Sequence, residues 1–124
     1  MILGIGIDMV EIERMEKACK KDAFLTRIFT EEECRQARGN PSHLAGNFAV
    51  KEAVAKALGT GFQTFMPIHI EVLRDELGKP YVKLYEGAEE LANQRGIQRI
   101  HVSITNTDEC SAAIAIGEGM EEGR

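Results

Sequence analysis

The stretch FAVKEAVAKALGTG, residues 48–61, sets the pattern around which the rest of the chain is organised. At about 100° per residue on a helix, six small or branched apolar residues share one face: Ala49, Val50, Ala53, Val54, Ala57 and Leu58. Gly59 stands where such a helix ends, and Thr60 and Gly61 continue a small, flexible exit. The stretch therefore predicts a core helix that finishes in a loop whose backbone can approach a ligand closely.

The polar residues of the same helix suggest a chemical role. Lys51, Glu52 and Lys56 fall away from the apolar face, and Glu52 and Lys56 are neighbours because they are four residues apart. A carboxylate and two ammonium groups beside a glycine loop suit a metal-bound phosphate. The same spacing also occurs in an ordinary core helix with a Glu-to-Lys surface pair worth about 0.3–0.5 kcal/mol. Spacing alone leaves both interpretations open.

Length and composition restrict the class of protein. The chain has 124 residues, enough for one domain with a modest core, and 44% of them are hydrophobic. No run approaches the ~18 apolar residues of a membrane span, and the start MILGIGIDMV does not resemble a signal peptide. Three scattered cysteines, Cys19, Cys34 and Cys110, favour reduced thiols over a disulfide framework or a zinc site. We expect a cytoplasmic protein without a membrane partner.

Charge is distributed unevenly along the chain. The net charge of −5 argues against a general nucleic-acid binder. Residues 14–27 nevertheless contain five basic and two acidic residues, a local excess of +3; the basic ones are Arg14, Lys17, Lys20, Lys21 and Arg27. Such a run is either a solvated helix face, its usual meaning, or a docking surface for an acidic partner.

The order of the predicted elements favours an α+β fold. The first strand, 2–10, places Leu3, Ile5, Ile7 and Met9 on one face, while two glycines on the other face leave room for close approach. Asp8, near the end of that glycine face, could either ligate a metal or cap the following helix. Thr30 and Glu33 match a capping box. The remaining pattern predicts helices at 11–20, 30–38, 42–58 (with Ser42 as cap) and 86–95, a mixed segment at 23–29, and strands at 69–73, 81–84, 100–105 and 112–116.

These elements predict a small mixed sheet of about five strands packed with three to four helices. The domain would comprise residues 1–117, followed by a polar tail at 118–124. The apolar strand faces are generous for so short a chain, which suggests that a second subunit covers one of them.

Three separated blocks together resemble one family. GIGIDMVEIERM (4–15), FAVKEAVAKALGTG (48–61) and HVSITNT (101–107), with the turn LGKPYV (77–82) between them, are similar to holo-acyl-carrier-protein synthases, the small single-domain 4′-phosphopantetheinyl transferases. The resemblance implies transfer of the 4′-phosphopantetheine arm of coenzyme A to a serine of an acyl carrier protein, with release of 3′,5′-adenosine bisphosphate. It also implies magnesium and a homotrimer with active sites between subunits.

The resemblance assigns roles to individual residues. Asp8 and Glu52 match the family's metal carboxylates, and Lys56 matches the lysine that meets the phosphate. Phosphoryl transfer needs positioning and charge stabilisation, which two carboxylates on magnesium and one lysine can supply. Glu52 is the candidate base, directly or through a metal-bound water. The expected coenzyme A contacts are Lys51, Lys56, Gly59, Thr60, Gly61, Ser103 and Asn106.

The resemblance also bears on the basic run and on one departure from the family pattern. Acyl carrier proteins are acidic, so the basic run gains a partner, with Arg14 and Lys17 as leading contacts ahead of Lys20, Lys21 and Arg27. Family members commonly have histidine where this chain has Asn106, and an amide can donate a hydrogen bond but cannot carry a proton.

Two other classes of function compete with the transferase. A non-catalytic, oligomeric small-ligand module would explain the glycine strand and the apolar faces, but not Asp8, Glu52 and Lys56 together. A nucleotide-binding protein that recognises only adenosine bisphosphate would bind its ligand without modifying a carrier protein.

Overall fold

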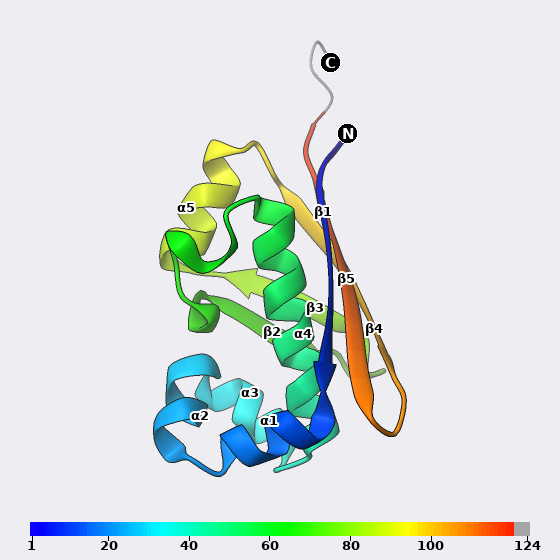
Figure 1. Cartoon of the computed structure of the whole chain (residues 1–124). Helices are drawn as coiled ribbons and strands as arrows, with labels where there is room; N and C mark the ends of the chain where they lie inside the picture. Colours follow the sequence, from blue (N-terminus) through cyan, green and yellow to red (C-terminus); the bar gives the residue numbers. More distant parts are fainter. Residues whose placement is uncertain (121–124) are drawn as a thin grey trace.

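Two antiparallel sheets lie on either side of one long helix in the computed structural model, which describes residues 1–120 (Figure 1). The elements are β1 (Ile2–Glu11), α1 (Ile12–Cys19), α2 (Asp22–Ile28), α3 (Glu31–Ala37), α4 (Pro41–Leu58), η1 (Gly61–Gln63), η2 (Pro67–His69), β2 (Ile70–Arg74), β3 (Pro80–Leu84), α5 (Glu86–Gln94), β4 (Arg99–Asn106) and β5 (Cys110–Glu118). The α+β class and five strands are confirmed. The strands form two sheets, ordered β1-β5-β4 and β2-β3, rather than one. None of the helices in residues 1–120 is long and apolar enough to cross a bilayer.

Local signals at the helix ends were mostly read correctly. Thr30 and Glu33 form the predicted capping box, and Gly59 ends α4 in the left-handed conformation with φ 93°. The prediction for Ser42 is wrong, because Asn40 caps α4 by accepting hydrogen bonds from the next backbone amides. Most of the stretch 23–29, expected as a mixed segment, belongs to α2, which spans Asp22–Ile28.

Glu118 and Gly119, which the sequence assigned to the C-terminal tail, are part of the folded domain. Glu118 still belongs to β5, and Gly119 is buried and donates its backbone N–H to the carbonyl of Met1. Residues 121–124 of that predicted tail lie outside the described part of the chain.

The contact between β1 and α4 depends on two glycines. A Cβ atom built on Gly6 would lie 1.9 Å from the carbonyl oxygen of Ala53, and one on Gly4 would lie 2.0 Å from that of Ala57. Neither distance is possible for real atoms, so the backbone of the strand touches the backbone of the helix. The close approach predicted from the glycine face is confirmed.

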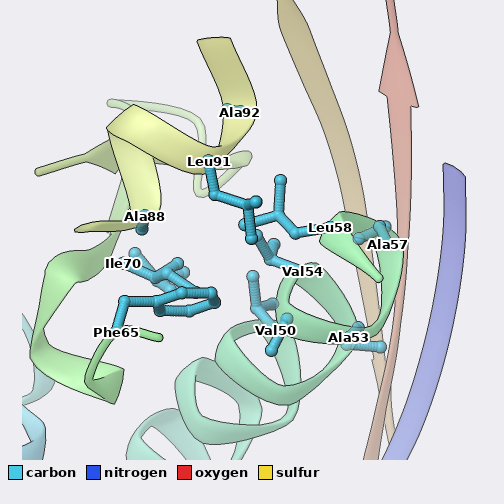
Figure 2. Close-up of a cluster of buried hydrophobic side chains, with 14 of the residues drawn as sticks. Val50, Ala53, Val54, Ala57, Leu58, Phe65, Ile70, Ala88, Leu91 and Ala92 are labelled. Carbon is cyan, nitrogen blue, oxygen red and sulfur yellow. The ribbon is translucent and has the colours of Figure 1, made fainter. Parts of the chain in front are cut away.

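The other side of α4 carries the larger side chains of the core. Figure 2 shows Val50, Val54 and Leu58 directed towards α5, β2 and the loop that follows α4, where they meet Leu91, Ile70 and Phe65. Ala53 and Ala57 point instead towards the strands of the first sheet (Figure 2). Because both sides are covered, α4 is buried nearly all round rather than along one stripe.

The outer face of the β1-β5-β4 sheet is apolar and exposed. Ile5, Ile7 and Met9 of β1 are 64%, 65% and 68% exposed, and their β5 partners across the sheet include Ile114 and Ile116. Within residues 1–120 no helix covers this face (Figure 1). The apolar side chains on this face of β1 therefore point away from the core, because the opposite face, which carries the glycines, packs on α4.

A buried ion pair connects α4 to α3 and β2. The Lys51 ammonium and the Glu33 carboxylate, both fully buried, lie 2.9 Å apart. The ammonium also donates to the carbonyls of Pro67, at 3.1 Å, and Ile70, while the backbone N–H of Val72 donates to Glu33. Burial raises the pKa of Glu33 and lowers that of Lys51, against their mutual attraction. The prediction that Lys51 stands beside Glu52 and contacts coenzyme A is therefore wrong.

Gly6→Ala should destabilise the fold strongly. The added methyl must push β1 away from the backbone of α4, and overpacking at a site with no flexible neighbour costs about 3 kcal/mol or more. Urea unfolding of wild type and variant measures the difference. A loss below about 1 kcal/mol, which is ordinary for a tolerated core change, would contradict the backbone contact.

Lys51→Met should lower the free energy of unfolding by about 3–5 kcal/mol, since it leaves the Glu33 carboxylate buried without its counter-charge. The double variant Lys51→Met/Glu33→Gln should lose less than the sum of the single changes. Lys83→Met, which removes an exposed lysine from β3, is the control and should be nearly neutral. A neutral Lys51→Met in urea unfolding would show that the pair is not a structural connection.

Candidate functional site

Asp8 and Glu52 line one cleft between β1 and α4. Asp8 belongs to the glycine face of β1, and Glu52 belongs to the stretch of α4 that passes this face. The cleft has a volume of about 460 Å³ and is also lined by Met9, Val10, Glu11, Arg14, Met15, Ala18, Phe24 and Phe48. Its wall thus combines three acidic residues and one arginine with an apolar part, and the apolar lining residues Met15, Phe24 and Phe48 were not predicted.

The residues of α4 that reach this region form one narrow stripe. Phe48, Glu52 and Lys56 are four residues apart in succession, and between Leu44 and Leu58 they are the positions of α4 that are not buried. Lys51 lies about 100° round the helix from Glu52 and points into the core. The sequence placed Glu52 and Lys56 on one face, without Phe48, but could not separate them from Lys51, because the second buried side of α4 depends on the distant strand β2.

Lys56 pairs with Asp8 rather than with Glu52. Its ammonium lies 3.3 Å from Oδ1 of Asp8 and donates to the backbone carbonyl of Ile7 at 2.8 Å. Glu52 is half-buried, and its pKa is raised by burial first and by the Asp8 charge second, while Lys56 lowers it. Glu52 and Lys56 are neighbours as predicted, but the salt bridge of Lys56 joins α4 to β1.

The donor set fits a hard divalent cation. Two carboxylates share the cleft, and the charge of Asp8 adds to burial, the larger cause, in raising the pKa of Glu52. Among residues 1–120, no group of three or more His, Cys, Asp or Glu side chains could hold a metal. A magnesium site with one or two protein carboxylates, completed by phosphate oxygens and waters, matches this set.

The glycine loop, residues 59–61, begins three residues, about one helical turn, after Lys56. Gly59 and Gly61 both adopt positive φ, at 93° and 60°, and the Thr60 hydroxyl donates to the carbonyl of Gly61 at 3.0 Å. The guanidinium of Arg95, at the end of α5, lies against Gly59, where an added Cβ would be 2.6 Å from its Nη1. Arg95 brings a cation to the loop, and no local sequence signal pointed to it because the packing of α5 places it there.

Ser103 and Asn106 lie apart from this cleft in the single chain. Both belong to β4, and β5 separates β4 from β1. Ser103 pairs with Ile114, which pairs with Ile7, so Ser103 lies on the outer face of the sheet, opposite to Asp8. Asn106 is exposed at the β4–β5 hairpin. One chain therefore brings together Asp8, Glu52 and Lys56, but not the two predicted β4 contacts.

The basic residues line three hollows rather than one surface. Lys17, Lys21 and Arg27 line a groove of about 490 Å³ together with Phe24, and Arg14 lines the cleft of Asp8 and Glu52. Lys20 borders a different groove, next to Leu25. Glu11 and Glu13 pair with Arg14, at 3.9 Å, and Lys17, at 3.2 Å. The excess of +3 holds for residues 14–27, but residues 11–27, which include these two acids, hold five basic and four acidic side chains and carry only +1.

Comparison with known proteins identifies relatives of this chain. Residues 4–115 match the profile of the 4′-phosphopantetheinyl transferase superfamily. The chain is 56% identical over 122 residues to the holo-[acyl-carrier-protein] synthase of Lachnoclostridium phytofermentans, covering 98% of this chain and 100% of that protein.

Solved structures agree with the sequence relatives. The fold matches the holo-[acyl-carrier-protein] synthase of Neisseria meningitidis with a TM-score of 0.85 and 33% identity, covering 95% of this chain and 99% of that one. It matches the Helicobacter pylori synthase in complex with coenzyme A with a TM-score of 0.82 and 30% identity, covering 92% and 99%. The chain therefore belongs to the 4′-phosphopantetheinyl transferase superfamily, among the holo-acyl-carrier-protein synthases.

Proposed function

We propose that this chain transfers the 4′-phosphopantetheine group of coenzyme A to a serine of an apo-acyl carrier protein and releases 3′,5′-adenosine bisphosphate. The observation that carries the proposal is the convergence of Asp8, Glu52 and Lys56 from β1 and α4 on one region of the surface. Two acids and one ammonium beside a glycine loop suit a pyrophosphate substrate. The coenzyme A complex of the Helicobacter pylori relative supports the choice of substrate.

Asp8 and Glu52 would hold the magnesium ion. When bound there, the ion would withdraw charge from the phosphoryl oxygens. Lys56 would supply a positive charge to the leaving phosphate. Thr60 and the amides of Gly59 and Gly61, with Arg95 beside them, would hold phosphate oxygens at the end of α4.

Glu52 is the proposed base. The serine oxygen attacks the phosphorus bonded to the pantetheine oxygen, its proton passes to the carboxylate of Glu52, and the bond from phosphorus to the oxygen of adenosine bisphosphate breaks. Burial and the neighbouring Asp8 raise the pKa of Glu52, which makes it a stronger base than an exposed carboxylate. Asn106 would contribute a hydrogen bond rather than a proton.

A homotrimer with active sites between subunits would account for two features of the chain. The outer face of the first sheet exposes Ile5, Ile7 and Met9, a patch that favours burial by another chain. Ser103 and Asn106 do not reach Asp8 within one chain, so a neighbouring subunit would have to bring them to the cleft. We propose that these two residues complete the coenzyme A site of the adjacent protomer.

The carrier protein would dock beside the cleft along α1 and α2. The groove of Lys17, Lys21 and Arg27 and the cleft of Asp8 and Glu52 share Ala18 and Phe24 in their walls, so the two hollows adjoin. A carrier helix with acidic residues could pair with these cations while its serine approaches Glu52. Lys20 is the weakest candidate, since it borders another groove.

We also propose a cytoplasmic location. Cys19, Cys34 and Cys110 are all free thiols in the structure, and reduced cysteines are typical of proteins kept in a reducing compartment.

The transferase proposal predicts magnesium-dependent labelling of an acyl carrier protein by a fluorescent coenzyme A analogue. Asp8→Asn should reduce turnover by orders of magnitude, because it removes one carboxylate from the metal site, and Glu52→Gln should reduce it further by removing the base. Glu89→Gln, an exposed acid on α5, is the control and should stay active. Full activity of either site variant at low magnesium would refute the assignment, and ligand binding without any labelling would favour a non-catalytic module.

The assembly proposal predicts that Ile7→Asp dissociates the homotrimer, since a charge would be buried at each interface. Leu77→Asp makes the same chemical change at a residue 95% exposed in the β2–β3 turn, and it should leave the trimer intact. Light scattering at assay concentration measures the molecular mass. An active wild-type monomer would contradict the proposal.

The docking proposal predicts that Arg14→Glu/Lys17→Glu raises the Michaelis constant for the carrier protein and leaves coenzyme A binding nearly unchanged. Wild-type association should weaken with added salt, because exposed charges are screened over ~10 Å at 0.1 M. Lys83→Glu gives a matched charge reversal on β3 and should have little effect. Association that does not depend on salt would count against an electrostatic contact.

A further inference from the structure

The Lys56 ammonium is held at the carboxylate that the metal site needs. The Lys56 side chain is only half exposed, at 52%, and its ammonium makes two contacts with β1: Oδ1 of Asp8 at 3.3 Å and the carbonyl of Ile7 at 2.8 Å. Asp8 is more enclosed, with 20% of its side chain exposed. The pair therefore connects α4 to β1 next to Glu52.

A divalent cation and this ammonium cannot both be placed favourably at Asp8. They compete for the same carboxylate oxygens, and as like charges a few ångströms apart they repel each other. Solvent screens this repulsion less in a partly enclosed cleft than on an open surface. Asp8, Glu52 and Lys56 together carry a net charge of −1, so one of the two acid charges is already balanced before any metal arrives.

A pyrophosphate changes this balance. It offers Lys56 a second anionic partner and adds negative charge and oxygen ligands for the metal. A ligand that favours the arrangement with Lys56 released from Asp8 shifts the protein towards it, and the metal favours the same arrangement. The two ligands must then strengthen each other's binding by the same factor.

We propose that Lys56 is a tethered competitor of the divalent cation, which holds Asp8 in the free protein and moves to the phosphate when coenzyme A binds, so that metal and coenzyme A enter the site cooperatively. This inference rests on the proposed function, since it takes coenzyme A as the pyrophosphate ligand. The metal should therefore bind only weakly to the protein alone, because the Lys56 ammonium already occupies the Asp8 carboxylate.

The test is direct binding of Mn²⁺, counted by electron paramagnetic resonance of the free ion, with and without saturating coenzyme A. Lys56→Met removes the charge from an exposed position, and circular dichroism verifies its fold. Without coenzyme A it should bind Mn²⁺ about tenfold more tightly than wild type, the effect of one nearby unit charge at a partly exposed site. The factor by which coenzyme A tightens Mn²⁺ binding should be smaller in this variant than in wild type.

Two controls separate the local charge from other effects. Lys56→Arg keeps the cation and should bind Mn²⁺ within about twofold of wild type, as should Lys83→Met, which removes an equal charge from β3. Unchanged Mn²⁺ affinity in Lys56→Met would overturn the proposed competition, while carrier labelling decides separately whether the chain is a transferase. Mn²⁺ binding that Asp8→Asn leaves intact would overturn both the competition and the metal site.

Discussion

The contact of two backbones, β1 against α4, fixes the geometry on which the site depends. Gly6 and Gly4 let the strand approach the carbonyls of Ala53 and Ala57 without any side chain between them. Glu52 and Lys56 flank Ala53 on the helix, and Asp8 is two residues from Gly6 on the strand, so this contact sets how far the acids and the ammonium stand apart. A single added methyl would change that separation before it touched any functional group.

The same helix is held in place on two opposite sides, by backbone contact on one side and by side-chain packing on the other. Small residues meet the first sheet through backbone contact, while Val54 and Leu58 fill the space towards α5 and β2 (Figure 2). The Lys51–Glu33 pair then connects α4 to α3 and β2 through hydrogen bonds that leave the ammonium no free direction. Only the stripe of Phe48, Glu52 and Lys56 is not buried in this part of α4, so the side chains of the candidate site project from a helix that is packed on its other sides.

Much of the fold could be predicted because its signals are local. The capping box at Thr30, the stop at Gly59 and the alternation in β1 each involve residues close in sequence. The errors arose where distant segments decide the outcome. Lys51 is charged and sits beside Glu52 on a helical wheel, but β2 and α3 enclose it. Likewise, the sequence contained five strands, but only long-range pairing divides them between two sheets.

The site shows the same division between local and distant information. Asp8, Glu52 and Lys56 were predicted as a group because two short motifs carry them, whereas Arg95 came from the packing of α5. β1 also carries two functions on opposite faces of one pleat: Asp8 faces α4, and its neighbour Ile7 faces outwards on the surface that we propose for assembly. Since side chains alternate with a period of two, a shift of β1 by one residue would exchange these faces. The proposed metal ligand and the proposed assembly surface therefore depend on the same register of β1, and moving the strand by one residue would displace both.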